Sequence, residues 1–147
     1  MINMHGEESK LAIVDADGLI GLMSKDDKHH SKCIEINNFL NAQGFRLLIP
    51  YGIVLEASTA VARAEDPKKP ILAHKLLVTF QQASEPSHFD LNVGITVSKL
   101  YNPQASAKHT PFDHYVLALA KQNNIRYVFS FDQFYAMNGL VLLEDLL

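Results

Sequence analysis

The sequence lacks the features that define several large classes of protein. It has one cysteine, Cys33, in 147 residues, so an internal disulfide is excluded and a reducing cytoplasm is the expected location. Its apolar runs, such as residues 11–14 and 52–55, are far shorter than the roughly 18 apolar residues of a membrane span. Its first residues do not pair a basic stretch with an apolar one, as a secretion signal does. We therefore expect neither a membrane helix nor a signal peptide.

Strong positive charge and the common nucleotide and zinc motifs are also missing. The chain carries 13 Lys and Arg against 16 Asp and Glu, which argues against a protein that coats nucleic acid but leaves room for a metal-dependent nuclease. There is no glycine-rich phosphate loop, and the histidines are not at zinc-finger spacing. His29 and His30 are predicted to lie in a solvated loop and helix start, with phosphate contact in an RNA groove as the alternative. The same two alternatives apply to Lys108 and His109.

The composition that remains is that of one globular domain. Hydrophobic residues make up 48% of the chain, enough for a core that needs neither disulfides nor a structural zinc ion. We expect residues 1–10 to be a flexible tail and residues 11–147 to be a single domain. Short apolar runs alternate with helical periodicity, which predicts an α/β fold with three α/β/α layers and a central parallel sheet of about five strands.

The expected elements follow from apolar spacing and from helix stop signals. Strands are predicted at residues 11–14, 45–49, 89–93, 125–131 and 140–143. Helical periodicity covers residues 33–40, 53–64, 72–80 and 94–101, and further helices open at Thr110 and end at Asn138. Residues 66–70 are predicted to be a linker, and residues 102–109 a surface loop.

Two acidic residues follow predicted strands at the point where each strand ends. Asp15 and Asp132 would lie at the carboxyl edge of the sheet, where open α/β sheets form their ligand crevice. Aspartate is also a preferred residue for capping the start of a helix, so both positions, and Asp17, have a purely structural explanation as well. Position at a shared sheet edge is what makes Asp15 and Asp132 candidates for a common site.

Two further acids lie on predicted helices. Asp113 is three residues after Thr110, a spacing that suits a capping box, yet a helix that begins at the same sheet edge would also aim its carboxylate at the crevice. Glu56 is at the border of the apolar face of its helix, as expected at the lip of a cleft. The alternative for Glu56 is a solvated side chain that pairs with Arg63.

These four acids, in their local contexts, resemble the PIN-domain ribonucleases, and in particular the toxins of VapBC-type toxin–antitoxin pairs. The matching stretches are residues 12–17, 53–56, 112–120 and 128–134, and the resemblance extends over about residues 11–143. The family usually has a threonine after the first aspartate and a serine or asparagine one residue later, where this chain has Ala16 and Asp17. Ser130 matches the hydroxyl residue that the family places two residues before the last aspartate.

The resemblance implies a PIN-like fold and a divalent-metal-dependent endoribonuclease that hydrolyses RNA phosphodiesters. It implies that Mg²⁺ or Mn²⁺ is held by four carboxylates and that Ser130 and Asp17 support them. The implied ligands are Asp15, Glu56, Asp113 and Asp132. Both ions prefer hard oxygen ligands, which carboxylates provide. The resemblance further implies an RNA substrate, a small antitoxin protein that docks beside the cleft, and a homodimer.

Two alternatives share parts of this pattern. A catalytically inactive PIN-like protein-interaction domain would have the same architecture, and would differ in whether the four acids converge. Residues 15–19 also match the first motif of haloacid-dehalogenase phosphatases, in which the first Asp is a nucleophile and the second an acid. That phosphatase would need a lysine after a later strand and a closing pair of acids, where this chain offers Asp132 with Ser130.

Overall fold

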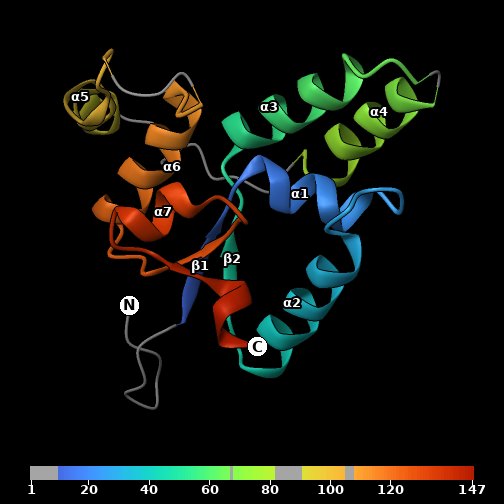
Figure 1. Ribbon diagram of the computed structural model, residues 1–147, viewed down its shortest axis with the longest axis horizontal. Helices are drawn as coiled ribbons and strands as arrows, with labels where there is room; N and C mark the ends of the chain where they lie inside the picture. Colours follow the sequence, from blue (N-terminus) through green and yellow to red (C-terminus); the bar gives the residue numbers. More distant parts are fainter. Residues whose placement is uncertain (1–9, 67, 82–90, 105–107) are drawn as a thin grey trace.

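The computed structural model describes residues 10–66, 68–81, 91–104 and 108–147. Its centre is a parallel sheet in the strand order β2-β1-β3-β4 (Figure 1). The strands are β1 (Leu11–Val14), β2 (Arg46–Leu48), β3 (Tyr127–Phe129) and β4 (Val141–Leu142). Strand β1 is paired on both edges and its last three residues are fully buried, which explains why it is a continuous apolar run.

Helices surround the sheet. They are α1 (Ala16–Met23), α2 (His30–Ala42), α3 (Tyr51–Ala62), α4 (Lys69–Thr79), α5 (Leu91–Leu100), α6 (Pro111–Gln122) and α7 (Gln133–Met137), followed by a 3₁₀ turn at Leu143–Leu146. Figure 1 shows α6 and α7 on one side of the sheet, α1 and α2 on the other, and α3 and α4 beyond the carboxyl ends of the strands. The predicted α/β, PIN-like layered fold is confirmed. In the described part of the chain, every helix is too short or too polar to cross a membrane.

The structure corrects the sequence prediction in the region of the expected strand at residues 89–93. Residues 91–93 open α5, and residues 89–90 lie outside the described part, so the described sheet has four strands and not about five. The alternation of apolar and polar residues from Phe89 to Val93 favoured a strand. However, Val93, Val97 and Leu100 recur at helical spacing and pack against the core, so tertiary burial determines the conformation.

Smaller differences concern segment ends. Helix α1 was not predicted, since its two glycines lower helix propensity. The predicted linker is shorter than expected because Lys69 and Pro70 already belong to α4, where proline is tolerated in the first turn. Residues 1–9 of the expected tail and residues 105–107 of the expected loop lie outside the described part. Lys10, the last residue of the expected tail, is described, and its carbonyl oxygen accepts a 2.8 Å hydrogen bond from the Arg46 N–H.

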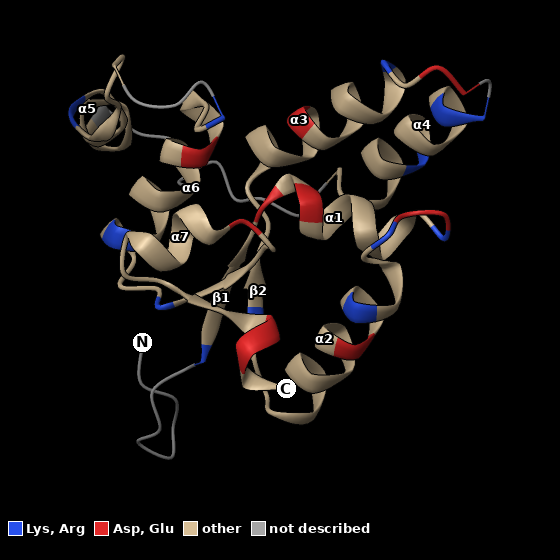
Figure 2. Ribbon diagram, viewed as in Figure 1, with Lys and Arg blue, Asp and Glu red and all other residues tan. Residues whose placement is uncertain are grey.

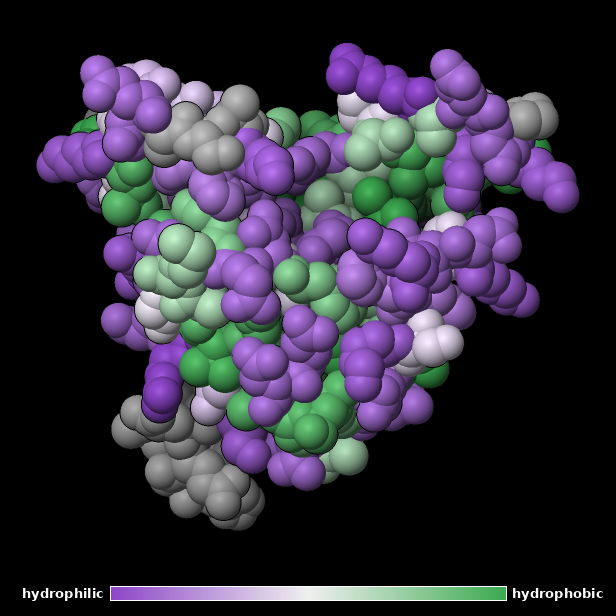
Figure 3. All heavy atoms as spheres, in the orientation of Figure 1, coloured by the Kyte–Doolittle hydropathy of each residue, from purple (hydrophilic) through white to green (hydrophobic). Residues whose placement is uncertain are grey.

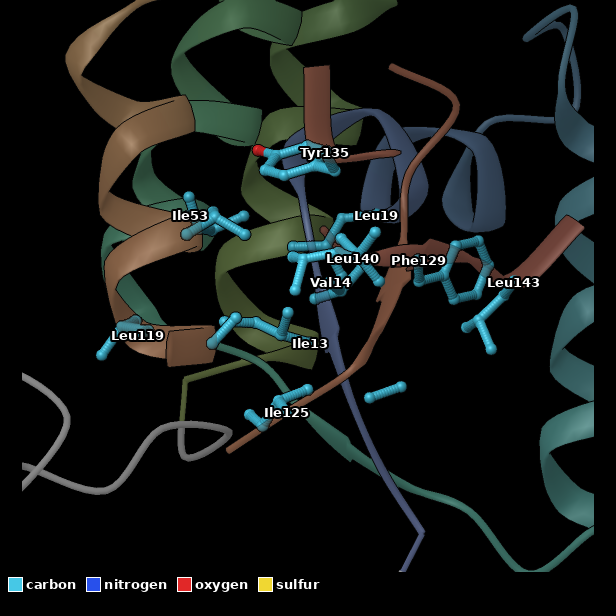
Figure 4. Close-up of a cluster of buried hydrophobic side chains, with 14 of the residues drawn as sticks. Ile13, Val14, Leu19, Ile53, Leu119, Ile125, Phe129, Tyr135, Leu140 and Leu143 are labelled. Atoms are coloured by element: carbon cyan, nitrogen blue, oxygen red, sulfur yellow. The ribbon is translucent and has the colours of Figure 1, made fainter. Parts of the chain in front are cut away.

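The core joins α1 to the centre of the sheet. Figure 4 shows Val14, Leu19, Phe129 and Tyr135 in the same buried cluster. Helix α1 approaches β3 so closely at Gly18 that a Cβ atom there would lie 2.7 Å from the Phe129 carbonyl oxygen. This close approach places the start of α1 beside the end of β3, and both ends carry acidic residues.

Candidate active site

Asp15 lies at the end of β1 and caps α1. Its side chain is only 6% exposed, its Oδ1 accepts a 2.8 Å hydrogen bond from the Ala16 N–H, and its Oδ2 accepts a 2.7 Å hydrogen bond from the Tyr135 hydroxyl. Burial raises the pKa of Asp15 from 3.8 to about 8, with further increases from the charges of Asp17 and Glu56. The fold thus holds a carboxyl group where ionisation is costly unless a cation is close.

Asp17 ties the two acidic strand ends together. Its Oδ1 accepts from the Gly18 N–H at 2.8 Å, and its Oδ2 accepts from the Ser130 hydroxyl at 3.0 Å and the Phe131 N–H at 2.8 Å. Ser130 in turn accepts a 3.1 Å hydrogen bond from the Asp132 N–H. Both oxygens of Asp17 are therefore engaged, Oδ1 within the first turn of α1 and Oδ2 with the loop after β3. This speaks against the phosphatase alternative, in which this residue would exchange protons with a substrate.

Asp113 and Asp132 each cap a helix, as their sequence contexts predicted. Asp113 Oδ2 accepts from the Thr110 N–H at 2.8 Å in a capping box, and Asp132 Oδ1 accepts from the Phe134 N–H at 2.9 Å. The second oxygen of each carboxylate takes no hydrogen bond from the described residues. Burial raises the pKa of Asp113, and the nearby charge of Asp132 adds to the increase. Capping fixes one oxygen of each group and leaves the other available to a ligand.

Glu56 reaches the same region from α3. Its Oε2 is buried and has no hydrogen-bond partner among the described residues, and no ion pair with Arg63 is formed. Burial is the main cause that raises the pKa of Glu56 from 4.5 to about 7, and the charges of Asp113 and Asp17 raise it further. Glu56 therefore lies beside the other acids, as its place at the border of the apolar helix face predicted, and does not form the alternative pair with Arg63.

The acids gather at the carboxyl end of the sheet. Figure 2 shows acidic segments at the starts of α1 and α6, before α7 and on α3 around this edge. Asp113 and Asp132, together with His109, have ligand atoms within 4.8 Å of one another. Asp15 and Glu56 lie outside this close set, although the charge of Glu56 raises the pKa of Asp15 and the charge of Asp113 raises that of Glu56.

Among the described residues, the acids of this cluster form no ion pair with a lysine or an arginine. Within the described residues, the one ion pair joins Lys32 and Glu35 on α2. Figure 3 shows the surface hollowed between the part formed by α5 and α6 and the part formed by α3 and α4, with hydrophilic residues toward the middle. Carboxylate oxygens without partners, raised pKa values and no paired cation are what a Mg²⁺ or Mn²⁺ site requires of its ligands, so the donor set fits a divalent metal.

Sequence reasoning missed two residues of this site. His109 was assigned to a surface loop, but its position directly before the Thr110 cap is one that often packs against the first turns of a helix, and its ring stacks on Phe134 with centroids 4.8 Å apart. Tyr135 gave no signal, because its hydroxyl meets Asp15 across 120 residues of sequence.

The fold is that of a known toxin structure. The chain superposes on the crystal structure of Mycobacterium tuberculosis VapC20, a toxin that cleaves the sarcin–ricin loop, with a TM-score of 0.67 and 13% sequence identity. The match covers 89% of this chain and 96% of VapC20. No family model and no curated protein sequence matches the chain. The structural match agrees with the fold that the resemblance implied.

Proposed function

We propose that this protein is a divalent-metal-dependent endoribonuclease. The observation that carries the proposal is that Asp15, Glu56, Asp113 and Asp132 come from four separate segments to one edge of the sheet, where none of them forms an ion pair with a described lysine or arginine. Burial raises the pKa of Asp15, Glu56 and Asp113, and the charge of a neighbouring acid of this set adds to each increase. Repulsion among buried acids lowers the stability of the fold, and a non-catalytic interaction domain would gain nothing from it. The convergence therefore favours the catalytic alternative.

In this proposal, the four carboxylates hold Mg²⁺ or Mn²⁺, and the remaining residues keep them in place. The chemistry that such an ion supplies is activation of water and neutralisation of charge on the attacked phosphate. Tyr135 orients Asp15 through its hydroxyl, and the Thr110 N–H fixes one oxygen of Asp113. The Ser130 hydroxyl supports Asp132 by accepting a hydrogen bond from the backbone N–H of Asp132, and it donates one to Asp17.

The biological role that we propose is the toxin of a toxin–antitoxin pair. It is supported by the fold shared with VapC20 over most of both chains. A structured RNA is accordingly the proposed substrate, and a small antitoxin the proposed partner. The homodimer and the cytoplasmic location expected from the sequence stay predictions.

The test is cleavage of RNA by metal-free protein to which ions are returned. We expect cleavage with Mg²⁺ or Mn²⁺ and none with EDTA. Asp15→Asn and Asp113→Asn should each abolish cleavage and keep a native circular dichroism spectrum, because each replaces a charged ligand at nearly constant volume. Asp145→Asn, an exposed acid outside the cluster, is the control and should cleave normally. Retained cleavage in either cluster variant would remove that residue from the site.

A further inference from the structure

We propose that His109 is a direct metal ligand, which makes the site a mixed nitrogen and oxygen site that discriminates in favour of Mn²⁺ over Mg²⁺. This inference rests on the proposed function, because it concerns the same metal. It adds a residue outside the four-acid pattern. It also specifies the ion, which the four acids alone leave open between Mg²⁺ and Mn²⁺.

The first observation is geometric. A ring nitrogen of His109 lies with a carboxylate oxygen of Asp113 and one of Asp132 so that all three are within 4.8 Å of one another. Three ligand atoms at such separations can share one ion, since metal to ligand distances of about 2.0–2.2 Å place ligands up to roughly 4 Å apart. Small side-chain movements suffice to close the remaining gap.

The second observation is an unused nitrogen. The Nδ1 atom of His109 is buried and has no hydrogen-bond partner among the described residues. Burying a polar atom without a partner is unfavourable, so native structures rarely leave one. The nearby His114 shows the usual arrangement, because its Nδ1 is within 2.8 Å of the Thr110 carbonyl oxygen. A metal ion is a partner that would account for the difference between the two rings.

The third observation is that the His109 ring is held in position without using Nδ1. It stacks on Phe134 with an angle of 27° between the ring planes. The backbone N–H of Phe134 is the donor that fixes Asp132 Oδ1. The imidazole and the carboxylate are thus positioned by the same residue, and a ligand set fixed in this way needs little reorganisation when an ion binds.

The chemistry of the imidazole determines which ion benefits. Both ions prefer oxygen ligands, but Mg²⁺ keeps several waters and demands near-ideal oxygen coordination, whereas Mn²⁺, a first-row transition ion, accepts an imidazole nitrogen more readily than Mg²⁺ does. A nitrogen ligand in place of a water should therefore strengthen Mn²⁺ binding and leave Mg²⁺ binding almost unchanged.

The experiment compares the wild-type protein with His109→Phe, which keeps a ring on Phe134 and removes both nitrogens. His74→Phe, at an exposed position on α4, is the matched control. Loss of even an outer partner of a ligand costs about 10–100-fold in metal affinity, so calorimetry should show Mn²⁺ affinity at least about tenfold lower in His109→Phe. Mg²⁺ affinity should fall by a much smaller factor, and His74→Phe should match wild type for both ions.

A spectroscopic measurement makes the test independent of any variant. Pulsed electron paramagnetic resonance of Mn²⁺ bound to the wild-type protein should show coupling to ¹⁴N, which changes to ¹⁵N coupling when histidine is isotopically labelled. Bound Mn²⁺ without nitrogen coupling, or coupling that persists in His109→Phe, would overturn the assignment of His109 as a ligand and leave the proposed function standing. No binding of Mn²⁺ or Mg²⁺ to wild-type protein would instead overturn the proposed function.

Discussion

At the scale of single residues, three acids of the candidate site have a capping role beside the metal-binding role that we propose. Asp15, Asp113 and Asp132 each use one oxygen to accept a backbone N–H at the start of a helix. A capping hydrogen bond removes rotational freedom from the carboxylate, so the same bond that stabilises the helix also aims the other oxygen. The structural explanation of these residues is therefore correct and compatible with the proposed functional one, and substitution has to separate the two.

Asp132→Ser separates the two roles. Serine caps nearly as well as aspartate, so the free energy of unfolding of metal-free protein should change by less than about 0.5 kcal/mol or increase as repulsion from Asp17 and Asp113 is relieved. Mn²⁺ affinity and RNA cleavage should fall. Asp66→Ser is the matched control, because Asp66 makes the same kind of bond, at 2.9 Å to the Lys68 N–H, away from the cluster.

The outcome that contradicts this assignment is equally specific. Urea denaturation of Asp132→Ser would show a loss above about 2 kcal/mol, the upper end for losing a cap, with Mn²⁺ binding unchanged. Asp132 would then be a structural residue only.

At the scale of elements, the positions of helix starts build the site. Helices α1, α6 and α7 begin at the same edge of the sheet, and their N-terminal ends are the ends that favour negative charge. The contact of α1 with β3 is the tightest of these placements, because Gly18 leaves room for the Phe129 carbonyl oxygen and side chain. A side chain there would push Asp15 and Asp17 away from Ser130.

Gly18→Ala should therefore destabilise the protein in spite of the higher helix propensity of alanine. We expect a loss of about 1–3 kcal/mol in the free energy of unfolding, typical of overpacking in a core. Gly94→Ala in α5 is the control, since a Cβ there meets nothing within 4 Å, and it should stabilise the protein by about 0.5–1 kcal/mol. Chemical denaturation measures both, and equal stabilisation by the two changes would show that α1 can move away from β3.

At the scale of the whole molecule, the fold accepts electrostatic repulsion at one edge of the sheet. The raised pKa values of Asp15, Asp17, Glu56 and Asp113 all have burial as their main cause, and the acids add to it by their charges. The buried apolar core on both sides of the sheet supplies the stability that offsets this repulsion. Metal-free protein should consequently be most stable where these groups are protonated.

The pH dependence of stability follows from the same shifts. The pKa of Asp15 is 3.8 in the unfolded chain and about 8 in the folded one, so the folded chain binds more protons between these values. The free energy of unfolding should therefore fall as the pH rises from about 5 to about 8. A decrease of at least about 1.4 kcal/mol, the equivalent of one pKa unit, is expected.

This measurement is made by urea denaturation in EDTA. Asp15→Asn removes the titrating group, so its stability should depend less on pH over the same range. Saturating Mn²⁺ should also flatten the dependence in the wild-type protein, because metal binding favours the ionised carboxylates. Stability that increases with pH in metal-free wild-type protein would show that burial does not penalise these groups.

The sequence by itself determined the fold class and placed the main acids of the proposed site at one edge of the sheet. The apolar run of residues 11–14 predicts β1, because a strand covered on both faces has no polar side. The spacing of Thr110 and Asp113 predicts the capping box, because that interaction is local. Strand ends in a parallel sheet share one edge, so the neighbourhood of Asp15 and Asp132 is also predictable.

The tertiary structure alone decided what depends on contacts between distant residues. Helix α1 forms around two glycines because Gly18 packs closely on β3 and Gly21 on Cys33 of α2. Residues 91–93 become helical because Val93 is buried in the core. Tyr135 and His109 join the site through partners that no sequence window contains together. The pKa shifts arise mainly from burial. Because burial depends on how the layers pack together, the sequence around each acid does not predict these shifts.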